Sequence, residues 1–344
     1  MKKYIVALLA ASMVFCTSCS QKKETAQIDI EKEKKVDVVE EVIEKEPKNE
    51  FCEMMESDLR PVAVMIDNDS EDARPQIGLE NAYMVYEIIV EGGKSRMMAL
   101  FKNHDIEKVG PIRSSRHYFL NFALEHDAIY CHAGWSPKAM SDISALGVNN
   151  INGIQGDDGT VYWRDNTYDN TWHNLYSGVD KLYDKATNEK GYRGKSDTKH
   201  IGYLNEDTTP ETDAVAEAIE LSYSKYYRVS YRYNSETKNY ERYVDNGEHV
   251  SQTGEILTAK NIIIYKLRNY TLADGTTTGR QEVETVGSGS GYYITNGKCV
   301  NINWSKPSRT EKTVYTTEDD EELKVNPGNT YIQIVPENQN IKIS

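Results

Sequence analysis

Two arginines bracket two serines in the segment VGPIRSSRHYF, residues 109–119, of an otherwise acidic chain. Ser114 or Ser115 is a suitable N-cap, so the apolar residues that follow predict a helix that begins there. The start of a helix carries unpaired N–H groups and a positive dipole end, which makes Arg113 and Arg116 unfavourable for the helix itself. Both become favourable if an anion binds there. The segment therefore predicts an anion-binding site, unless these arginines pair with the protein's own carboxylates.

Two histidines are candidates for moving a proton at such a site. His132 lies near the end of a predicted strand, and ligands in open α/β sheets gather beyond the carboxyl ends of parallel strands. His173 and Asn174 are central to RDNTYDNTWHNLYSG (164–178), a loop dense in amide and aromatic side chains. Such a loop can bind sugars or peptides, and it can equally be a packed structural loop. A lone histidine is more often structural, so catalysis is the alternative to binding.

Acidic residues follow the first predicted strands. Asp67 and Asp69, in MIDNDS, lie after a strand, where paired acids occur in magnesium-dependent phosphotransferases. Asp and Asn also favour turns, so this pair alone does not predict a metal, and we expect no metal or cofactor. Glu87 and Glu91 would share one face if residues 78–93 were helical, and they would then be available as internal partners of the arginines.

Strands and helices alternate in the first half of the chain. The predicted strands are PVAVMID (61–67), RMMALFK (96–102) and AIYCHAG (128–134). Residues 136–147 predict a helix that Ser136 caps and Gly147 ends. This alternation predicts an α/β domain with a mixed sheet over residues 56–205, which places the candidate residues at strand ends.

The second half, residues 206–344, has a different pattern. Residues 209–225 predict a linker helix, and aromatic and polar residues then alternate on both sides of turns. GSGSG (287–291) precedes a strand, so it predicts a flexible turn and not a dinucleotide-binding loop. We therefore expect a mainly antiparallel β domain rich in tyrosine, and an α+β chain overall.

The first 18 residues predict a lipoprotein signal peptide. Lys2 and Lys3 precede about a dozen apolar residues, which are too few for a spanning helix. The sequence Thr17-Ser18-Cys19 resembles the bacterial lipobox, which implies cleavage before Cys19 and a lipid, such as palmitate, attached there. We expect the chain to be anchored by this lipid at the extracytoplasmic face of the bacterial cell membrane.

Residues 19–55 comprise the lipidated Cys19 and a segment rich in Lys and Glu, which predicts a solvated tether that reaches on the order of 30 Å. The net charge of the chain is -14, and loss of Lys2 and Lys3 takes it to -16. We therefore expect no nucleic-acid partner and no general attraction to anionic lipid. Besides Cys19, the cleaved chain would keep only Cys52, Cys131 and Cys299, which are widely spaced and odd in number and therefore predict no disulfide framework.

Several motifs together resemble the YerB-like family of bacterial lipoproteins. They are RPVAVMIDN, ARPQIGLENAYMVYE, VEGG followed by Arg96, VGPIRSSR, HDAIYCHAG, HNLY and NPGNTYIQIVP. The resemblance covers nearly everything after the tether, and it implies a lipoprotein with an N-terminal and a distinct C-terminal domain, both of unknown function. Two positions depart from the family pattern. Asp69 is often not acidic in relatives, and Trp172 stands where the family leads us to expect proline.

Our first hypothesis is a lipoprotein that binds an anionic ligand of the cell envelope. Its partner would be a wall polymer, a phosphate-bearing ligand or an envelope protein, besides the membrane that holds the lipid. The predicted anion-binding residues are Arg96, Arg113, Ser114, Ser115 and Arg116. The residues expected to line the cleft are Asn68, Arg74, Glu87, Glu91 and Asn174.

The alternative hypothesis is an enzyme that acts on envelope polymers, either a phosphotransferase or a hydrolase. Arg113 and Arg116 would hold a phosphate group. The proton would be moved by His132, Asp67 or His173. Convergence of these side chains on one water-accessible cleft would favour the enzyme, whereas arginines saturated by acids in a dry core would have a structural role only.

Overall fold

The structure is a computed structural model that describes residues 49–344. The predicted signal peptide, Cys19 and most of the predicted tether lie outside the described residues. Helix α1 (Glu50–Glu56) begins within the last part of that tether segment, where the Asn49 side chain accepts a hydrogen bond from the Phe51 N–H. The described residues all belong to one compact unit. In the described part of the chain, no helix is long and apolar enough to cross a membrane.

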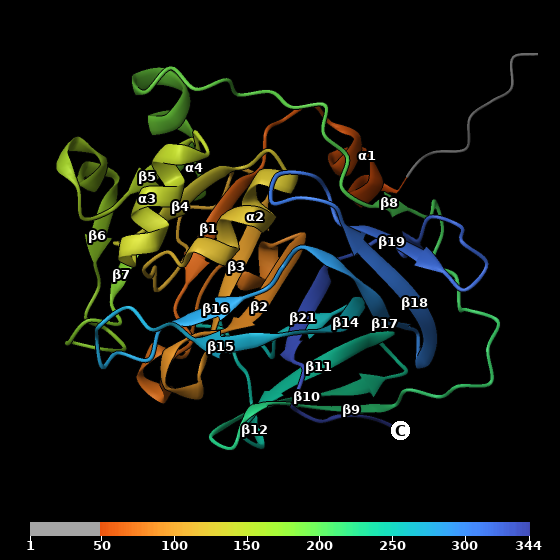
Figure 1. The fold of residues 1–344 in the computed structure, drawn as a ribbon. Coiled ribbons are helices and arrows are strands. Elements are labelled where there is room, and N and C mark those ends of the chain that lie inside the picture. Colours follow the sequence, from red (N-terminus) through yellow and green to blue (C-terminus); the bar gives the residue numbers. More distant parts are fainter. Residues whose placement is uncertain (1–48) are drawn as a thin grey trace, which may run out of the picture. The chain divides into compact units, whose positions relative to one another are not determined.

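One ten-stranded sheet runs through both halves of the described chain (Figure 1). In spatial order its strands are β19 (Val314–Thr317), β18 (Lys298–Lys306), β17 (Gly287–Thr295), β14 (Asn261–Leu267), β21 (Thr330–Pro336), β2 (Met84–Ile89), β3 (Ser95–Phe101), β1 (Val62–Ile66), β4 (Ile129–His132) and β5 (Asn150–Asn152). Strand β21 joins the halves because it pairs in parallel with both β2 and β14. The division into two domains stays a prediction, since this sheet is continuous across them.

The strands predicted in the first half are present, and together they form a mixed sheet. Strand β1 is apolar at every position and fully buried, as expected for a strand covered on both faces. It pairs antiparallel with β3 and parallel with β4, which in turn pairs parallel with β5. The carboxyl ends of β1, β4 and β5 therefore meet at one end of the sheet, where the polar candidate residues begin.

Short helices cover this half of the sheet. Helix α3 (Pro137–Ala145) is confirmed, with the Ser136 hydroxyl accepting a hydrogen bond from the Ala139 N–H. Helix α2 (His117–Glu125) is almost wholly buried, because apolar residues surround it. The remaining helical segments are α4 (Val179–Asp184), a π-helical turn (Lys185–Glu189) and 3-10 turns at Glu71–Ala73, Leu79–Asn81, Glu91–Gly93 and Gly156–Val161.

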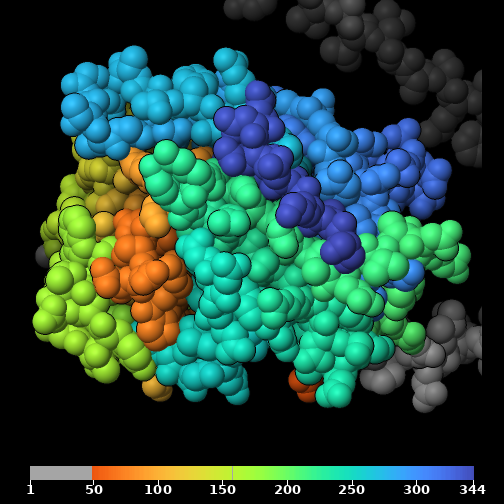
Figure 2. Space-filling view, turned by 90° about the horizontal axis from the view of Figure 1, so that it is seen from below, coloured from red at the N-terminus to blue at the C-terminus, as the bar shows by residue number. Residues whose placement is uncertain are grey.

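The second half is mainly antiparallel β, as the sequence predicts. A second sheet has the order β12 (Gly247–Glu248), β11 (Asn239–Val244), β10 (Tyr227–Asn234), β9 (Ala218–Ser224) and β22 (Ile341–Ile343), with β13 (Thr258–Ala259) paired to β11. The C-terminal strand β22 lies against β9 and appears as a blue band across the surface in Figure 2. The two-stranded pairs are β15 (Asn269–Thr271) with β16 (Gln281–Val283), β20 (Lys324–Val325) with β8 (Gly202–Tyr203), and β6 (Tyr162–Arg164) with β7 (Leu175–Ser177).

The linker helix predicted over residues 209–225 is wrong. Its second part is strand β9, in which Ile219, Leu221 and Tyr223 are buried at every second position. The alanines of this segment suggested a helix through propensity, but the alternation of apolar residues has the period of a strand. Pairing with β10 and β22 buries that face, and this burial outweighs the local preference of the alanines.

The flexible turn predicted for GSGSG (287–291) is also wrong, because these residues form the first half of β17. Residues 287–291 pair with β18 in regular register. A Cβ atom at Gly289 would lie 3.0 Å from the Trp304 indole nitrogen. A Cβ atom at Gly291 would lie 2.6 Å from the Ile264 carbonyl oxygen. Glycine is therefore used here for close approach of neighbouring groups and not for a bend.

Candidate functional site

Arg113 lies between the carboxyl ends of two parallel strands. Its N–H donates to the Met65 carbonyl oxygen at the end of β1 (2.9 Å), and its own carbonyl oxygen accepts from Ala133 just after β4 (3.0 Å). Asp67, the first residue after β1, donates its N–H to the Pro111 carbonyl oxygen (2.8 Å). Backbone hydrogen bonds thus hold the segment that contains the two arginines at the end of the sheet where α/β proteins bind their ligands.

The guanidinium group of Arg113 is paired with acids of the protein itself. Its Nε lies 3.0 Å from Asp67 Oδ2, and its Nη2 lies 3.3 Å from Asp69 Oδ2. The ring of Trp172 covers the guanidinium carbon at 4.9 Å, a cation–π contact. The Arg113 side chain keeps 20% of its surface exposed, so the pairing occurs at the edge of the protein and not in a dry core.

Arg116 is also paired, and the helix start differs from the prediction. Helix α2 begins at His117, with Arg116 as its N-cap and no side chain capping it. Neither serine is the cap, because Ser114 Oγ donates to the Ala133 carbonyl oxygen and Ser115 Oγ accepts from the Tyr130 hydroxyl. Arg116 Nε donates to Glu91 Oε1 at 2.7 Å, so Glu91 is the internal partner expected from the sequence.

Arg96, at the start of β3, brings a third guanidinium group to the same place. Its Nη1 donates to the Ser114 carbonyl oxygen (2.7 Å), and its Nη2 lies 3.7 Å from Asp69 Oδ2. Only 2% of Arg96 is exposed, yet its Nε has no hydrogen-bond partner. Burial, and repulsion by nearby Arg116, lower the pKa of Arg96 to about 10. We call Arg96, Arg113 and Arg116 with their acids the arginine cluster.

His173 joins this cluster through Asp67. Its Nδ1 donates to Asp67 Oδ2 at 2.8 Å, and its Nε2 lies 3.4 Å from the hydroxyl of Ser70. The hydrogen bond to Asp67 raises the pKa of His173, despite its burial. Burial alone would raise the pKa of Asp67, but the hydrogen bond from His173 and the charge of Arg96 lower it. Sequence reasoning missed Ser70, for which the signal was its place in MIDNDS three residues after Asp67.

Three residues expected to line the cleft belong to a buried network under the arginine cluster. Glu87 does not pair with Arg113 or Arg116, because it lies on strand β2 and binds the fully buried Arg242 at 2.8 Å. Asn68 donates to Glu87 Oε1 (3.2 Å) and accepts from Arg74 Nη1 (3.0 Å). This network holds the segment after β1 to the second sheet, which is a structural role.

Two further candidates lie apart from the cluster. His132 is fully buried, with Nδ1 2.7 Å from the Gly134 carbonyl oxygen and Nε2 3.2 Å from Asn150 Oδ1. Burial lowers its pKa. Its backbone lies at the predicted end of the sheet, but its ring is used inside the fold. Asn174 is bonded to Arg164 and Asn166 within its own loop.

The outer side of the cluster faces solvent. Trp172 is 63% exposed, and the Asp69 side chain is 24% exposed. Figure 2 shows the segment after β1, in orange, at the surface between the yellow-green region of the β6–β7 loop and the teal region of the second sheet. Hydrogen bonds join the segment after β1 to both neighbours, from His173 Nδ1 to Asp67 Oδ2 (2.8 Å) and from the Gln252 N–H to the Gln76 carbonyl oxygen (2.8 Å).

Comparison with known proteins identifies the family. Residues 50–193 match the family described as "Protein of unknown function (DUF3048) N-terminal domain", and residues 219–332 match the C-terminal domain of the same family. The chain is 29% identical over 280 residues to the Bacillus subtilis protein named "Putative lipoprotein YerB", and the match covers 81% of this chain and 82% of that protein. The chain belongs to this YerB-like family.

A solved structure of the YerB-like family has the same fold. The crystal structure of YerB from Bacillus subtilis matches with a TM-score of 0.73 at 27% identity, covering 86% of this chain and all of that one. The α/β first half and the mainly antiparallel second half are therefore features of this fold. The family is one of lipoproteins of unknown function, so the chemistry has to be argued from the site.

At two positions of this site, Asp69 and Trp172, the sequence departs from the expected pattern of the YerB-like family. They are also the most exposed of its side chains that contact Arg113. Ligand atoms of Asp67, Asp69 and His173 lie within 4.8 Å of one another, close enough to hold a metal ion. The guanidinium group of Arg113 contacts both carboxylates, so its positive charge opposes a cation at that point.

Proposed function

We propose that this protein is a lipoprotein anchored through Cys19 at the extracytoplasmic face of the cell membrane, where it binds an anionic group of a cell-envelope ligand at the arginine cluster. Membership of a lipoprotein family and the lipobox-like Thr17-Ser18-Cys19 support the anchor. The envelope ligand would be a phosphate-bearing wall polymer or its lipid-linked precursor. The geometry around Arg96 and Arg113 supports the anion site.

The observation that carries this proposal is the unpartnered Nε of Arg96 beside two more guanidinium groups. A buried donor without a partner is costly, and three guanidinium groups close together repel one another. A bound anion with several oxygens would relieve both costs at once, because guanidinium groups bind phosphate and carboxylate in a fork geometry. The Nε of Arg113 also makes no hydrogen bond among the described residues, although Asp67 Oδ2 lies 3.0 Å away, so both arginines indicate a ligand.

Asp69 is the carboxylate that such an anion would replace. Its distances to Arg113 (3.3 Å) and Arg96 (3.7 Å) are longer than a good charge-assisted hydrogen bond, and its side chain is partly exposed. Asp67, in contrast, is fully buried and is held by both His173 and Arg113. We infer that Asp67 is a permanent part of the site, whereas Asp69 occupies the ligand's position in the free protein.

Binding measurements on the mature protein test this proposal, with inorganic pyrophosphate, polyprenyl phosphate and wall fragments as probes. We expect Arg113→Ala and Arg116→Ala to weaken binding about tenfold or more, since hydrogen bonds to charged groups contribute roughly 1.5–3 kcal/mol. Asp69→Asn should strengthen binding, because it removes the internal competitor. Arg193→Ala is the matched control, since Arg193 is exposed and pairs with Asp127 elsewhere. Equal binding by the wild type and both arginine variants would defeat the anion site.

A second function, hydrolysis or group transfer on the bound ligand, is favoured by one observation. His173 is oriented by Asp67 through Nδ1 and presents Nε2 to Ser70 Oγ at 3.4 Å, an arrangement in which His173 moves a proton for a nucleophile. His132 has no such arrangement. Turnover of a phosphate or carboxylate ester that Ser70→Ala and His173→Ala abolish, while anion binding is retained, would establish this activity. Binding without turnover would leave binding alone.

A further inference from the structure

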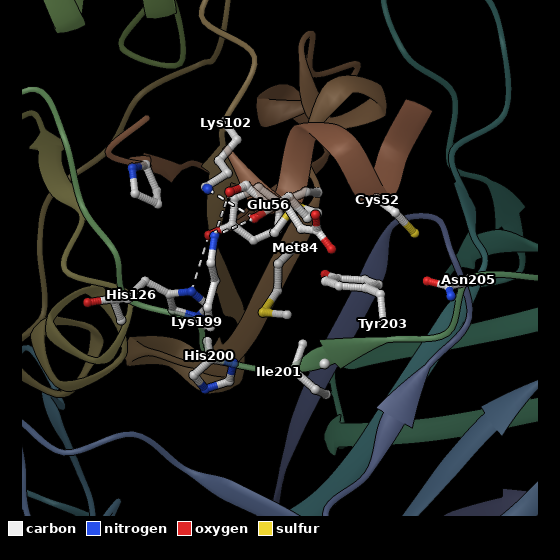
Figure 3. A pocket seen from close by; sticks show the side chains of 15 residues that line it. Cys52, Glu56, Met84, Lys102, His126, Lys199, His200, Ile201, Tyr203 and Asn205 are labelled. Atoms are coloured by element: carbon white, nitrogen blue, oxygen red, sulfur yellow. Dashed lines mark hydrogen bonds between the residues drawn. The ribbon is translucent and has the colours of Figure 1, made fainter. Parts of the chain in front are cut away.

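A cavity of about 470 Å³ lies at the opposite end of strands β1 to β3 from the arginine cluster. It is lined by Pro61 just before β1, Met84 at the start of β2 and Lys102 just after β3. Helix α1, the segment from Thr198 to Asn205, Tyr83 and His126 supply the rest of its lining (Figure 3). Its volume is within the roughly 300–1,000 Å³ of typical small-molecule sites.

Two lysine amines converge on one side of this cavity. Lys102 Nζ donates to the carbonyl oxygens of Met55 (3.1 Å) and Ser57 (2.5 Å). Lys199 Nζ donates to those of Met55 (3.1 Å) and Glu56 (3.0 Å). The two amines thus share the Met55 and Ser57 carbonyl oxygens as acceptors and lie close together, although like charges repel. Lys102 is only 3% exposed.

Neither amine has a carboxylate within 4 Å in the described part of the chain. Asp58, whose charge acts on Lys102 through space, forms its ion pair with Lys195 at 2.7 Å. Burial, and repulsion by Lys199, lower the pKa of Lys102 to about 8. In a chain with a net charge of -14, two neighbouring cations beside a cavity therefore have no acidic partner within 4 Å among residues 49–344.

A histidine on the same side of the cavity has a ring nitrogen that can form a hydrogen bond with a ligand. His200 is buried, and neither ring nitrogen makes a hydrogen bond within residues 49–344, although Nε2 lies 3.0 Å from Glu125 Oε1. The neighbouring His126, in contrast, contacts tyrosine hydroxyls through both ring nitrogens, at 3.2 Å and 2.9 Å. His200 is therefore the group whose hydrogen bonding a ligand would complete.

The side of the cavity opposite the basic residues is mainly apolar, and Glu56 and Asn205 also belong to the lining. In Figure 3 the labelled basic residues, Lys102, Lys199, His126 and His200, lie along one side of the cavity, and Met84 and Tyr203 lie across from them. Methionine side chains adapt to irregular apolar ligands because their thioether chains are flexible. The cavity thus separates charge from apolar surface, as a site for an amphiphilic molecule must.

We propose that this cavity binds a small amphiphilic anion, an aliphatic chain with a single carboxylate head group. The head group would accept hydrogen bonds from Lys102, Lys199 and His200, and the chain would lie along Met84 and Tyr203. The binding would be reversible, with no covalent step. This site is separate from the arginine cluster, so a test of this site and a test of the proposed anion-binding function can succeed or fail independently.

Photo-cross-linking of the full-length chain in phosphatidylcholine nanodiscs tests the proposal. The probe is a dodecanoate that carries a diazirine on its chain, and cross-linked peptides are mapped by mass spectrometry. We expect saturable labelling in residues 51–56, 83–84 or 198–205, displaced by dodecanoate at about tenfold lower concentration than by uncharged dodecanol. Labelling elsewhere only, or equal displacement by the two competitors, would overturn the proposal.

Variants separate the charge from the cavity itself. Lys199→Ala removes an exposed amine, so it should leave the fold intact while raising the concentration of probe needed for half-labelling about tenfold. Ile201→Trp should abolish labelling by filling the cavity with the charges unchanged. Lys138→Ala is the matched control, since Lys138 is an exposed lysine paired with Asp142. If Lys199→Ala and Ile201→Trp were both labelled to the same extent as the wild type, the proposed site would be wrong.

Discussion

A cationic side chain lies at each end of strand β3, and the two differ in their partners, which are carboxylates at one end and backbone carbonyl oxygens at the other. Arg96, its second residue, belongs to a cluster in which guanidinium groups are balanced by carboxylates. Lys102, one residue past its other end, sits beside Lys199 with backbone carbonyl oxygens as the only acceptors found in the described residues. Six residues of extended chain separate the two, roughly 20 Å at about 3.3 Å per residue. Strand β3 therefore connects a site whose cations are paired with carboxylates to a site whose cations are not.

This difference distinguishes two kinds of cationic cluster in an acidic protein, one that is part of the fold and one that is available to bind an anion. Where fixed acids surround the cations, as Asp67 does for Arg113, the charge is part of the fold, and only a loosely held acid such as Asp69 can give way to a ligand. Where carbonyl oxygens alone receive the cations, the charge stays available for an anion. Each region therefore predicts a different response to loss of one charge.

The largest effect is expected from removing the fixed acid. Asp67→Ala would leave Arg113 without its closest carboxylate and His173 without its partner, and breaking a buried pair in this way costs roughly 3–5 kcal/mol. Urea unfolding followed by circular dichroism measures this loss. Asp58→Ala, which removes an acid from an exposed pair with Lys195, should leave the unfolding midpoint unchanged. Similar midpoints for Asp67→Ala and the wild type would mean that the cluster is not held together by charge.

The pH dependence of the Asp67–His173 pair gives the next largest effect. The pKa of His173 is raised in the folded protein, so its stabilisation is complete below its ordinary value of 6.5 and is lost as pH rises through the raised value. We expect His173→Gln to lower the free energy of unfolding by about 1–2 kcal/mol at pH 5 and by clearly less at pH 9. Urea titrations of both proteins at the two pH values measure this. A difference that grows with pH would contradict the assignment.

The two regions also differ in how far the sequence could predict them. Arg113, Arg116 and Asp67 stand beside recognisable strand and helix signals, so the position of each near the end of an element could be predicted from local pattern, whereas their convergence stayed an open question. Arg96 and Lys102 lie within or beside an apolar strand, and their partners lie 18 to 47 residues away in the chain. Register and long-range pairing decide those contacts, and neither is visible in local periodicity.

The same reasoning explains the errors. Residues 209–225 contain alanines that favour a helix locally, but the neighbours β10 and β22 select a strand. Glu87 was expected beside Arg116, since a helix over residues 78–93 would place Glu87 and Glu91 on one face. Its place in β2 instead directs it to Arg242, a residue 155 positions further along the chain. Tertiary pairing outweighed local preference in both cases.

The lysine end should respond to pH in the opposite direction from a compensated pair. The pKa of Lys102 falls from 10.5 to about 8 in the folded protein, so folding favours the neutral amine. The stability of the wild type relative to Lys102→Met should therefore be lowest below pH 8 and should rise between pH 8 and pH 10.5. Unfolding in urea at pH 7 and pH 10 measures this difference. A relative stability that falls with pH would show that an acid compensates Lys102 after all.

The smallest effect is expected at the exposed rim of the arginine cluster. Trp172→Ala removes the ring that covers Arg113, a contact contributing about 0.5–1 kcal/mol at an exposed position. Because the ring also shields the guanidinium group from water, its loss should weaken binding of pyrophosphate two- to threefold, with the unfolding midpoint nearly unchanged. Tyr168→Ala, which removes another exposed aromatic residue of the same loop, is the control. If Trp172→Ala instead strengthened binding, the ring would be a lid over the anion position, and Asp69 would not be the only group that a ligand must displace.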